Sequence, residues 1–561
     1  MTELLVVLVI ALISIAAATV VAPRLGIAAP LVLVTVGVAA SFLPVFASVH
    51  IEPEWILAGV LPPLLYSSAV SMPAMNFRRE FGAISGLSVL LVVGSALLLG
   101  VFFTLVIPDL GFAWGVALGA IVSPTDAVAT SIIKRTTVSK RVVAILDGES
   151  LLNDATALVL LRTAIVAAAA SFSFWGAIGT FAYSVAIAAV IGWLVGWLNL
   201  VVRKRVTDPT VNTVISFTVP FLAAVPAELL GASGLVAAVV AGLITGILAP
   251  RNLSPQNRLS DTQNWRTVEL VLEGVVFLTM GLQIKQIVTN VQTDHAGVAP
   301  AVLIAVCALV LTILVRAAYI GPLLAVLKSR ARHAEKLQVQ LQGMQEKFAA
   351  PEGKQEAFGE VNRRLRQPSA RDLERFAVRV TRGLADIEYF RRQPLGWREG
   401  TVVVWAGMRG AVTVAAAQSL PVDAPQRSVL VLIAFAVAAL SLLVQGGTVG
   451  PLVRRLARQA GATGSGADAQ VKQQRDERER IIEIMKASAE SVSVPPRAEG
   501  DASPAGLQAA QQHYLAVLGA QRTALLDARD NGTFDADVLA NALANLDASQ
   551  IAVEMRGNPQ D

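Results

Sequence analysis

Long apolar stretches alternate with short polar segments along most of the chain. About thirteen of them come near or exceed the roughly 20 residues that a helix needs to cross a bilayer. They lie at 3–22, 28–47, 56–73, 82–107, 111–133, 149–170, 174–202, 210–227, 231–249, 268–288, 298–327, 398–420 and 428–451. The pattern predicts an all-α polytopic membrane protein with about thirteen transmembrane helices. Prolines 62 and 63 interrupt the third stretch, and acidic residues interrupt the sixth.

The charges of the connecting segments predict the orientation of these helices. Lysine and arginine collect in every second connection, at 78–79, 134–135, 140–141, 203–205, 251–258, 328–332 and 454–455. The connections between them are poor in both residues. Because cytoplasmic loops carry the excess of basic residues, we expect the N-terminus outside the cell and the C-terminus in the cytoplasm. An odd number of spans requires such an arrangement.

Two longer polar segments have a different composition. Residues 329–397 and 457–561 are charged and contain helical patterns at 338–348, 370–390, 471–491, 506–528 and 535–555. Both fall on the expected cytoplasmic side. The sequence therefore predicts a membrane domain at 1–328 with eleven spans, a cytoplasmic helical insert at 329–397, two further spans at 398–456 and a cytoplasmic helical tail at 457–561.

Composition narrows the classes of function. The chain is 54% hydrophobic and 16% charged, and it has one cysteine and four histidines. A single cysteine allows no disulfide framework, and no phosphate-binding glycine loop, nucleophile elbow or zinc spacing is present. We therefore expect neither an enzyme nor a bound cofactor, and no nucleic acid partner. The histidines lie in connecting or polar segments, so a proton inside the membrane must be carried by carboxylates.

The sixth apolar stretch contains four neighbouring polar residues, Glu149, Ser150, Asn153 and Asp154. On a helix, residues four apart are neighbours, so these side chains share one face. A carboxylate at a bilayer centre costs roughly 2.5 kcal/mol or more. We interpret the face as a site that binds a cation and a proton in turn. The alternative is a polar network that only holds helices together.

The fifth stretch is interrupted at 123–130 by a proline within a polar segment. Pro124 removes a backbone donor and leaves carbonyl groups free inside the membrane. Ion sites of secondary transporters form at broken helices of this kind. Thr125 and Asp126 add a hydroxyl and a carboxylate at the same place. We therefore predict cation ligands here, the alternative being a proline kink with a polar residue that pairs with a neighbouring helix.

Two arginines, Arg316 and Arg409, also lie inside apolar stretches and need partners. Glu149 and Glu273 are expected near the same depth. We predict that Arg316 pairs with Glu149, which leaves Asp154 as the acid that is free to exchange its charge.

Small residues flank Arg409 within 405–413, so we predict a second broken helix that crosses the first at Pro124. The alternatives are ordinary packing of small residues and an arginine that reaches the helix end. Arg162 in the sixth stretch has no evident partner, and Glu228 is expected at the mouth of the site rather than among its ligands.

Six segments together resemble the monovalent cation:proton antiporters of the sodium/proton exchanger (NhaP) type. Their sequences are Leu-Pro-Pro-Leu-Leu at 61–65, the segment at 123–130, Gly-Glu-Ser-Leu-Leu-Asn-Asp-Ala at 148–155, Leu-Glu-Gly-Val-Val-Phe at 272–277, Gly-Met-Arg-Gly-Ala-Val at 407–412 and Leu-Val-Gln-Gly at 443–446. The segments occur in the order of the family, and the tail around 520–555 is similar to tails of bacterial members.

The resemblance implies thirteen spans in two inverted repeats, a homodimer in the bacterial inner membrane and an elevator-like motion of a core domain. It implies that Asp154 is the exchanging carboxylate and that Asn153 orients the surrounding network. Thr125, Asp126 and Ser150 would complete the shell around a transported sodium ion. Glu149 and Arg316 would form a structural ion pair, and Arg409 would belong to the second crossing helix.

One departure concerns the acid that many members carry shortly after the Leu-Pro-Pro segment, because Ser67 and Ser68 occupy that place here. Oxygen ligands suit a hard cation such as sodium. Since Asn153 rather than a second acid precedes Asp154, we expect electroneutral exchange of one cation for one proton. The alternatives are a potassium/proton antiporter and a cation channel regulated by its tail.

Overall fold

The computed structural model describes residues 2–25, 27–43, 52–134, 136, 138–169, 174–294, 297–347, 369–459, 465–493 and 504–556. Within these ranges the chain is helical and contains no strand, which confirms the expected all-α fold class. The chain divides into two compact units. The first comprises Met1–Asn252, Leu259–Leu323 and Gly396–Ala457, and the second comprises Leu253–Arg258, Leu324–Leu395 and Arg458–Asp561.

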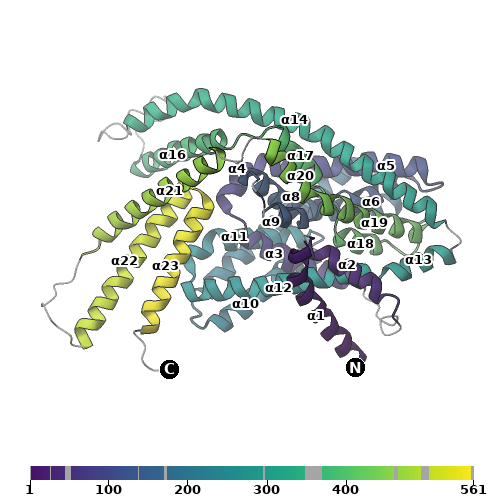
Figure 1. Cartoon of the computed structure of the whole chain (residues 1–561), viewed down its shortest axis with the longest axis horizontal. Coiled ribbons are helices and arrows are strands. Elements are labelled where there is room, and N and C mark those ends of the chain that lie inside the picture. The colour runs from purple at the N-terminus through teal and green to yellow at the C-terminus, as the bar shows by residue number, and fades with distance from the viewer. Residues whose placement is uncertain are drawn as a thin grey trace. The chain divides into compact units, whose positions relative to one another are not determined.

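Every apolar stretch that the sequence analysis identified contains at least one helix (Figure 1). In chain order these are α1 (Thr2–Leu25), α2 (Ala29–Ala40), η2 (Trp55–Val60), α3 (Leu61–Ser71), α4 (Ala74–Ser85), η3 (Gly86–Leu91), α5 (Val92–Val106), α6 (Phe112–Val122), α7 (Val128–Ile133), α8 (Lys140–Ala169), α9 (Phe174–Arg203), α10 (Pro209–Leu229), α11 (Gly234–Asn252), α12 (Pro255–Leu282), α13 (Ile284–Thr293), α14 (Val298–Lys347), α17 (Trp397–Trp405), α18 (Ala411–Gln418), α19 (Arg427–Ser441), η4 (Leu442–Gly446) and α20 (Gly447–Gln459). Among the described residues, nine helical segments are long and apolar enough to cross a membrane, and three shorter apolar helices accompany them. The count of thirteen spans stays a prediction.

Two of the expected spans are broken in the middle. The first consists of α6 and α7, which are separated by residues 123–127 around Pro124. The second consists of α17 and α18, which are separated by residues 406–410 around Arg409. Proline lacks a backbone donor and clashes with the preceding turn, so a helix stops before it. The interruption predicted at each of these positions is therefore present.

Several expected boundaries were wrong. The sixth span belongs to α8, which begins at Lys140 rather than at 149, and the tenth belongs to α12, which begins at Pro255 rather than at 268. The eleventh continues into the insert as one helix, α14, up to Lys347. In each of these cases the helix was expected to end where charged residues begin. Lysine, arginine, glutamate and glutamine are good helix formers, so leaving the apolar region does not end a helix.

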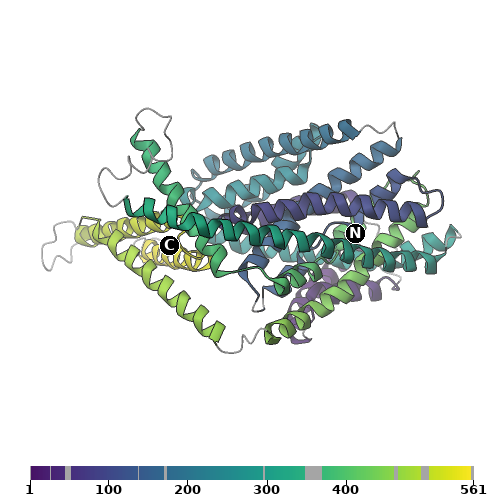
Figure 2. The same cartoon turned by 90° about the horizontal axis from the view of Figure 1, so that it is seen from above.

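The first unit contains two groups of helices. In the first helix group, α3, α9, α10 and α11 pack around Tyr66, Ala188, Val219, Ala223, Ala237 and Ala241. The blue-to-teal part of the chain, which includes α9, α10 and α11, forms neighbouring helices in Figure 2. In the second helix group, α5, α6, α8, α18 and α19 surround the two helix breaks. Apolar side chains of α3 and α11 meet those of α8 between the two groups, including Leu65, Val239 and Leu151. The centre of this contact is apolar, and an exposed ion pair between Arg162 of α8 and Glu228 of α10 also joins the two groups.

Small residues bring α6 close to α5 and so position the first break. Gly115 and Gly119 are four residues apart on α6 and face Gly100 and Ala96 of α5. A β-carbon added to Gly119 would lie 3.1 Å from the Cα atom of Ala96 and would overlap its carbonyl oxygen. Glycine at this spacing lets two membrane helices approach backbone to backbone.

The second unit combines the described parts of the insert and the tail, which the sequence analysis treated as separate domains. The end of α14 packs on α16 (Ala370–Arg392) through Leu341, Met344, Phe376 and Val380. The tail forms α21 (Ser465–Glu490), α22 (Pro504–Asn531) and α23 (Ala536–Arg556), which lie side by side (Figure 1) around a core that includes Ile481, Leu518, Leu525 and Leu539. Residues 348–368 of the insert and the predicted linker at 494–503 lie outside the described residues.

We predict that Gly119→Ala lowers the free energy of unfolding of the detergent-solubilised protein by about 1–3 kcal/mol, because the added methyl group forces α6 away from α5. The matched control is Gly94→Ala on α5, where a β-carbon would meet nothing within 4 Å. Thermal unfolding followed by tryptophan fluorescence measures both. An equal midpoint for the two variants would show that α5 and α6 do not pack this closely.

Candidate functional site

The two helix breaks cross each other and are joined by their backbones. The backbone N–H of Asp126 donates to the carbonyl oxygen of Met408 at 2.7 Å. The carboxylate of Asp126 accepts a hydrogen bond from the backbone of Val128 at 2.9 Å, at the start of α7. A β-carbon on Gly410 would overlap this carboxylate, so only glycine allows the second break to approach the first here. The crossing therefore depends on the residue type at 410 as well as on Pro124.

Arg409 occupies the centre of the crossing and is 2% exposed. Its guanidinium donates to the carbonyl oxygens of Val122 at 2.9 Å and Ser123 at 3.4 Å, and also to that of Gly407. These carbonyls end α6 and follow α17, where helices have unpaired acceptors and a partial negative charge. The position excludes the alternative in which Arg409 reaches the helix end, because its charge stays buried and its donors satisfy the carbonyls that the breaks leave free.

Three side chains of the predicted site form one hydrogen-bonded chain. The amide of Asn153 on α8 donates to the Thr125 hydroxyl at 2.7 Å and to the Thr125 carbonyl oxygen at 3.0 Å. The Thr125 hydroxyl in turn donates to Glu149 at 3.0 Å. Asn153 therefore holds the first break against α8. Its own amide oxygen is buried and has no hydrogen-bond partner in the described part of the chain.

Glu149 also forms a two-point ion pair with Arg316 of α14. The two distances between guanidinium nitrogens and carboxylate oxygens are 2.5 and 2.7 Å, and both side chains are buried. Arg316 additionally donates to the carbonyl oxygen of Val403 at 2.9 Å. The structure thus brings together the two residues that the sequence analysis paired. Two parallel hydrogen bonds fix the geometry as well as neutralise the charges.

Asp154 lies four residues after Ser150 on the same helix and lines a small cavity of about 10 Å³, about the room of one water molecule. The other lining residues come from α6, its break, α8 and α18, and they are Ala120, Ile121, Pro124, Ala157, Leu158, Leu161, Val412 and Ala416. The carboxylates of Asp126 and Asp154 are close enough to repel each other. Among the described residues, no group donates a hydrogen bond to the Asp154 carboxylate. Asp154 is therefore an acid whose charge the protein itself does not neutralise.

The remaining predicted residues lie around this centre. The Ser150 hydroxyl donates its hydrogen to the carbonyl oxygen of Asp147 in the same helix at 3.1 Å. The lone pairs of the Ser150 oxygen are therefore available to a cation. Glu273 of α12 interacts electrostatically with Asp126 and with Glu269 one turn away. Glu269, which the sequence analysis did not consider, meets the Ser67 hydroxyl at 3.4 Å. A signal for it was present, because Glu269 and Glu273 are four residues apart on one helix.

The structure adds two ion pairs that sequence reasoning missed. Arg141 and Glu80 form a buried pair, with 2.6 Å between the closest nitrogen and oxygen. Arg162 pairs with Glu228 at 3.0 Å, so the arginine without an evident partner has one. Glu228 is bound to this arginine and to the backbone of Gly234 and does not line the cavity. Neither pair could be assigned from sequence, because the partners are more than 60 residues apart.

The buried acids of the site differ in whether a cationic side chain neutralises them. Glu149 is neutralised by an arginine, whereas Asp154 lines a small cavity beside the first helix break and interacts electrostatically with Asp126. Two carboxylates in this position repel each other and attract a cation or a proton. Within the described ranges, no cluster of three or more histidine, cysteine or acidic side chains has the geometry of a metal site. The chemistry that these residues support is reversible exchange of a positive charge at Asp154.

A sequence profile of the family described as "Sodium/hydrogen exchanger, transmembrane" matches residues 8–345 and 375–455. The "Uncharacterized Na(+)/H(+) exchanger YjcE" of Escherichia coli is 34% identical over 265 residues, which cover 46% of this chain and 48% of the relative. The "Sodium, potassium, lithium and rubidium/H(+) antiporter" of Bacillus pumilus is 29% identical over 281 residues, which cover 48% of this chain and 41% of the relative. The chain thus matches about half or less of the length of these two relatives.

A solved structure shares the fold. The sodium proton antiporter MjNhaP1 from Methanocaldococcus jannaschii at pH 8 aligns with a TM-score of 0.55, at 14% identity, over 81% of this chain and 99% of the other. At this low sequence identity, the similarity shows that the two proteins share an arrangement of helices, and it does not show that their sites share the same chemistry.

We predict that Glu149→Gln lowers the free energy of unfolding by about 3 kcal/mol or more, because it leaves the buried Arg316 charge without its partner. The matched control is Glu228→Gln, which removes an ion pair whose side chains are 59% and 45% exposed and should cost less than about 1 kcal/mol. Thermal unfolding in detergent compares them. The role of the buried pair is refuted if the two variants unfold at the same temperature.

Proposed function

We propose, because this chain belongs to the transmembrane sodium/hydrogen exchanger family, that it exchanges sodium or lithium for protons across the membrane. The observation that carries the proposal is the position of Asp154, an acid without a protein partner beside the cavity at the crossed helix breaks. The matched relatives named as exchangers and antiporters support the same activity. The chain is a multi-pass membrane protein, and we expect it in a bacterial inner membrane.

Competition for Asp154 gives the exchange. A cation is held only while Asp154 is ionised, and protonation removes the charge that holds it. When the site opens alternately to the two sides of the membrane, each opening releases one ligand and loads the other. Movement of the second helix group along the apolar surface of the first would provide this alternating access. No separate path for the proton is needed.

The other residues have supporting roles in this proposal. Asp126 provides the second carboxylate, and the Thr125 and Ser150 oxygens complete the shell around the cation. Asn153 positions Thr125, to which it donates two hydrogen bonds. Glu149 and Arg316 form a structural pair whose charges cancel. Arg409 keeps the two helix breaks together through the carbonyls that it binds.

Glu273 and Glu269 extend the acidic surface along α12 toward Ser67. They offer a negatively charged approach for a cation on its way to Asp126. Many members of the family carry an acid near the position of Ser67. Here Glu269, whose carboxylate lies 3.4 Å from the Ser67 hydroxyl, would supply the carboxylate that is absent from position 67.

Potassium/proton exchange on the same scaffold is the second candidate. The Bacillus pumilus relative is named for sodium, potassium, lithium and rubidium, and all-oxygen sites distinguish these cations only by size and ligand number. Transport by a homodimer, with the N-terminus outside the cell, is part of the proposal. A tail-regulated channel is disfavoured, because apolar residues form most of the wall beside Asp154.

We predict that Asp154→Asn abolishes exchange, because an amide can neither bind a proton in turn with a cation nor neutralise one. The measurement is quenching of a pH-sensitive dye in proteoliposomes on addition of sodium, lithium or potassium. The control is Asp423→Asn, which changes an exposed acid between α18 and α19 and should retain the full rate. Size-exclusion chromatography shows whether the Asp154 variant is folded, and exchange by a folded variant would remove Asp154 from the mechanism.

We predict that the exchange is electroneutral, with one cation moved for each proton, because a single acid carries the exchanged charge. The initial rate in proteoliposomes should stay the same when a potassium gradient and valinomycin impose an inside-negative or an inside-positive potential. Sodium and lithium serve as the test cations, since potassium sets the potential. A rate that follows the imposed potential would mean that a second charge moves and would contradict the single-acid site.

A further inference from the structure

A buried cluster of polar side chains joins α9, α10 and α12 within the first unit. None of its members lines the cavity beside Asp154. We call it the Arg203 cluster, and its five residues are Arg203, Asn212, Ser216, Asp261 and Trp265. We propose that the Arg203 cluster positions Glu269 of α12 beside Ser67, and that Glu269 in this position raises the affinity for the transported cation. The inference deepens the proposed function and rests on it.

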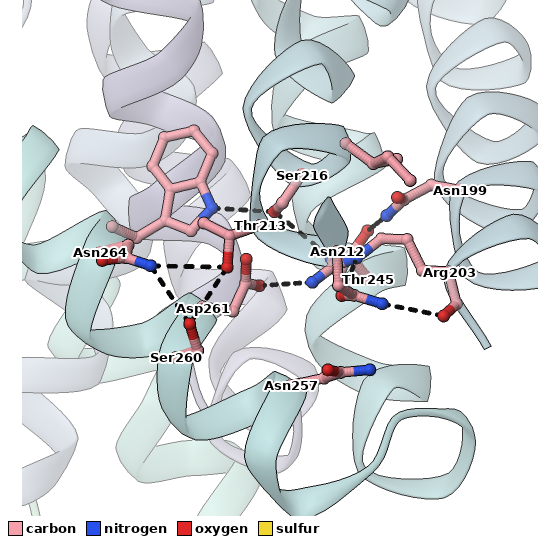
Figure 3. Close-up of polar contacts among 12 residues, drawn as sticks. Asn199, Arg203, Asn212, Thr213, Ser216, Thr245, Asn257, Ser260, Asp261 and Asn264 are labelled. Atoms are coloured by element: carbon pink, nitrogen blue, oxygen red, sulfur yellow. Dashed lines mark hydrogen bonds and ion pairs between the residues drawn. The ribbon is translucent and has the colours of Figure 1, made fainter. Parts of the chain in front are cut away.

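Arg203 of α9 is the centre of the cluster and is fully buried. Its guanidinium forms an ion pair with Asp261 at 3.0 Å and donates to Asn212 at 2.8 Å and to Ser216 at 3.3 Å (Figure 3). Asn212 donates back to the carbonyl oxygen of Arg203 at 2.8 Å. Displacement of a buried charge from such partners is costly, because it leaves polar groups unpaired. The cluster therefore fixes the part of α12 around Asp261 on α9 and α10.

Two further contacts attach α12 to α10. The Trp265 indole donates to the Ser216 hydroxyl at 2.9 Å, so Ser216 binds both Arg203 and Trp265. The hydroxyls of Thr213 on α10 and Ser260 on α12 meet at 3.3 Å (Figure 3). Rotation of α12 about its axis would break these hydrogen bonds together with the ion pair, so the contacts fix its rotation.

Glu269 belongs to the ridge of α12 that the cluster holds. Asp261, Trp265 and Glu269 follow one another at intervals of four residues, and side chains at this spacing form a continuous ridge on a helix. With a rise of 1.5 Å per residue, Glu269 lies about 12 Å along the axis from Asp261. A fixed rotation at Asp261 and Trp265 therefore fixes the direction in which the Glu269 side chain leaves the helix.

Two adjacent residues of α3 fix the position of α12 along its axis. The Tyr66 ring packs on Trp265 with 5.2 Å between the ring centroids, and Tyr66 is fully buried. Its neighbour Ser67 lies 3.4 Å from the carboxylate of Glu269, one turn after Trp265. Displacement of α12 by one turn along α3 would separate both pairs. The carboxylate of Glu269 is therefore held beside Ser67 by contacts that precede it on the same helix.

From this position Glu269 interacts with charged groups that surround the exchange site. They are Asp147 of α8, Lys134 at the end of α7 and Arg266 of α12. Glu269 also interacts with Glu273, which in turn interacts with Asp126. The attraction of a carboxylate for a cation falls with distance, so the contribution of Glu269 to cation affinity depends on where the cluster places it. Since the exchanged charge resides on Asp154, the maximal rate does not depend on this placement.

The split between cation affinity and maximal rate tests the proposal in proteoliposomes at one fixed pH. Arg203→Met with Asp261→Leu replaces the ion pair by apolar side chains, a change that buried pairs often tolerate. We expect the KM for sodium to rise roughly threefold while the maximal rate stays the same. The matched control is Asn199→Leu, which removes a buried hydrogen bond from α9 to Thr245 of α11 at 3.3 Å (Figure 3) and should leave KM unchanged.

Trp265→Phe is the second cluster variant. It keeps a ring beside Tyr66 and removes the hydrogen bond to Ser216, so it disturbs the packing less than the loss of the ion pair does. The KM for sodium should again rise with an unchanged maximal rate. If the variant without the ion pair does not fold, as judged by size-exclusion chromatography, Trp265→Phe alone supports or overturns the proposal.

A double-mutant cycle shows whether the cluster acts through Glu269. Glu269→Gln alone should raise the KM for sodium roughly tenfold. Addition of either cluster variant to Glu269→Gln should raise KM no further, because the carboxylate that the cluster positions is already absent.

Three results overturn the positioning role while the proposed function stands. They are an unchanged KM in Glu269→Gln, a maximal rate that falls at constant KM in the cluster variants, and a KM that rises further when a cluster variant is added to Glu269→Gln. Absence of exchange in the wild-type protein with sodium, lithium and potassium overturns the proposed function itself.

Discussion

The crossing of two broken helices depends on one buried guanidinium. Helix ends inside hydrocarbon carry unpaired carbonyl oxygens, and each unsatisfied group costs several kcal/mol. Arg409 donates to carbonyls at the ends of both broken spans, and its positive charge matches the negative ends of their dipoles. Gly410 then allows Asp126 to approach the second break. The irregular backbone from which a cation site can be built is possible only because these groups are paired.

The other buried charged groups are of two kinds: those that a partner in the protein neutralises and those that are left to bind a cation or a proton. Arg316 and Glu149 neutralise each other and tie α14 to α8. Asn153 uses its amide hydrogens on Thr125 and thereby fixes the first break beside α8. Asp126 and Asp154 receive no such cation from the protein and repel each other. Two acids without a cationic partner, held beside an ion pair whose charges cancel, form an arrangement that suits charge exchange.

The helices also differ in how firmly they are held: contacts within each helix group are closer and more polar than the contact between the groups. Close glycine contacts hold α6 on α5, and a buried polar network holds α9, α10 and the start of α12 together. Between the two groups the contact is mainly apolar, with one exposed ion pair between Arg162 and Glu228. Apolar contact is not directional, so it tolerates sliding better than hydrogen bonds do.

The sequence by itself determined the all-α membrane fold and the two breaks, and it identified candidate residues for the chemistry. It could do so because apolar runs, Pro124 and acids within hydrocarbon have strong local energetic consequences. Tertiary structure alone decided that Arg409 binds the carbonyls of another span, that Arg162 meets Glu228 and that insert and tail form one unit. Those partners are far apart in the chain, and local propensity contains no information about which distant groups meet. The pairing of Arg316 with Glu149 lies between the two cases, since few buried acids were available to choose from.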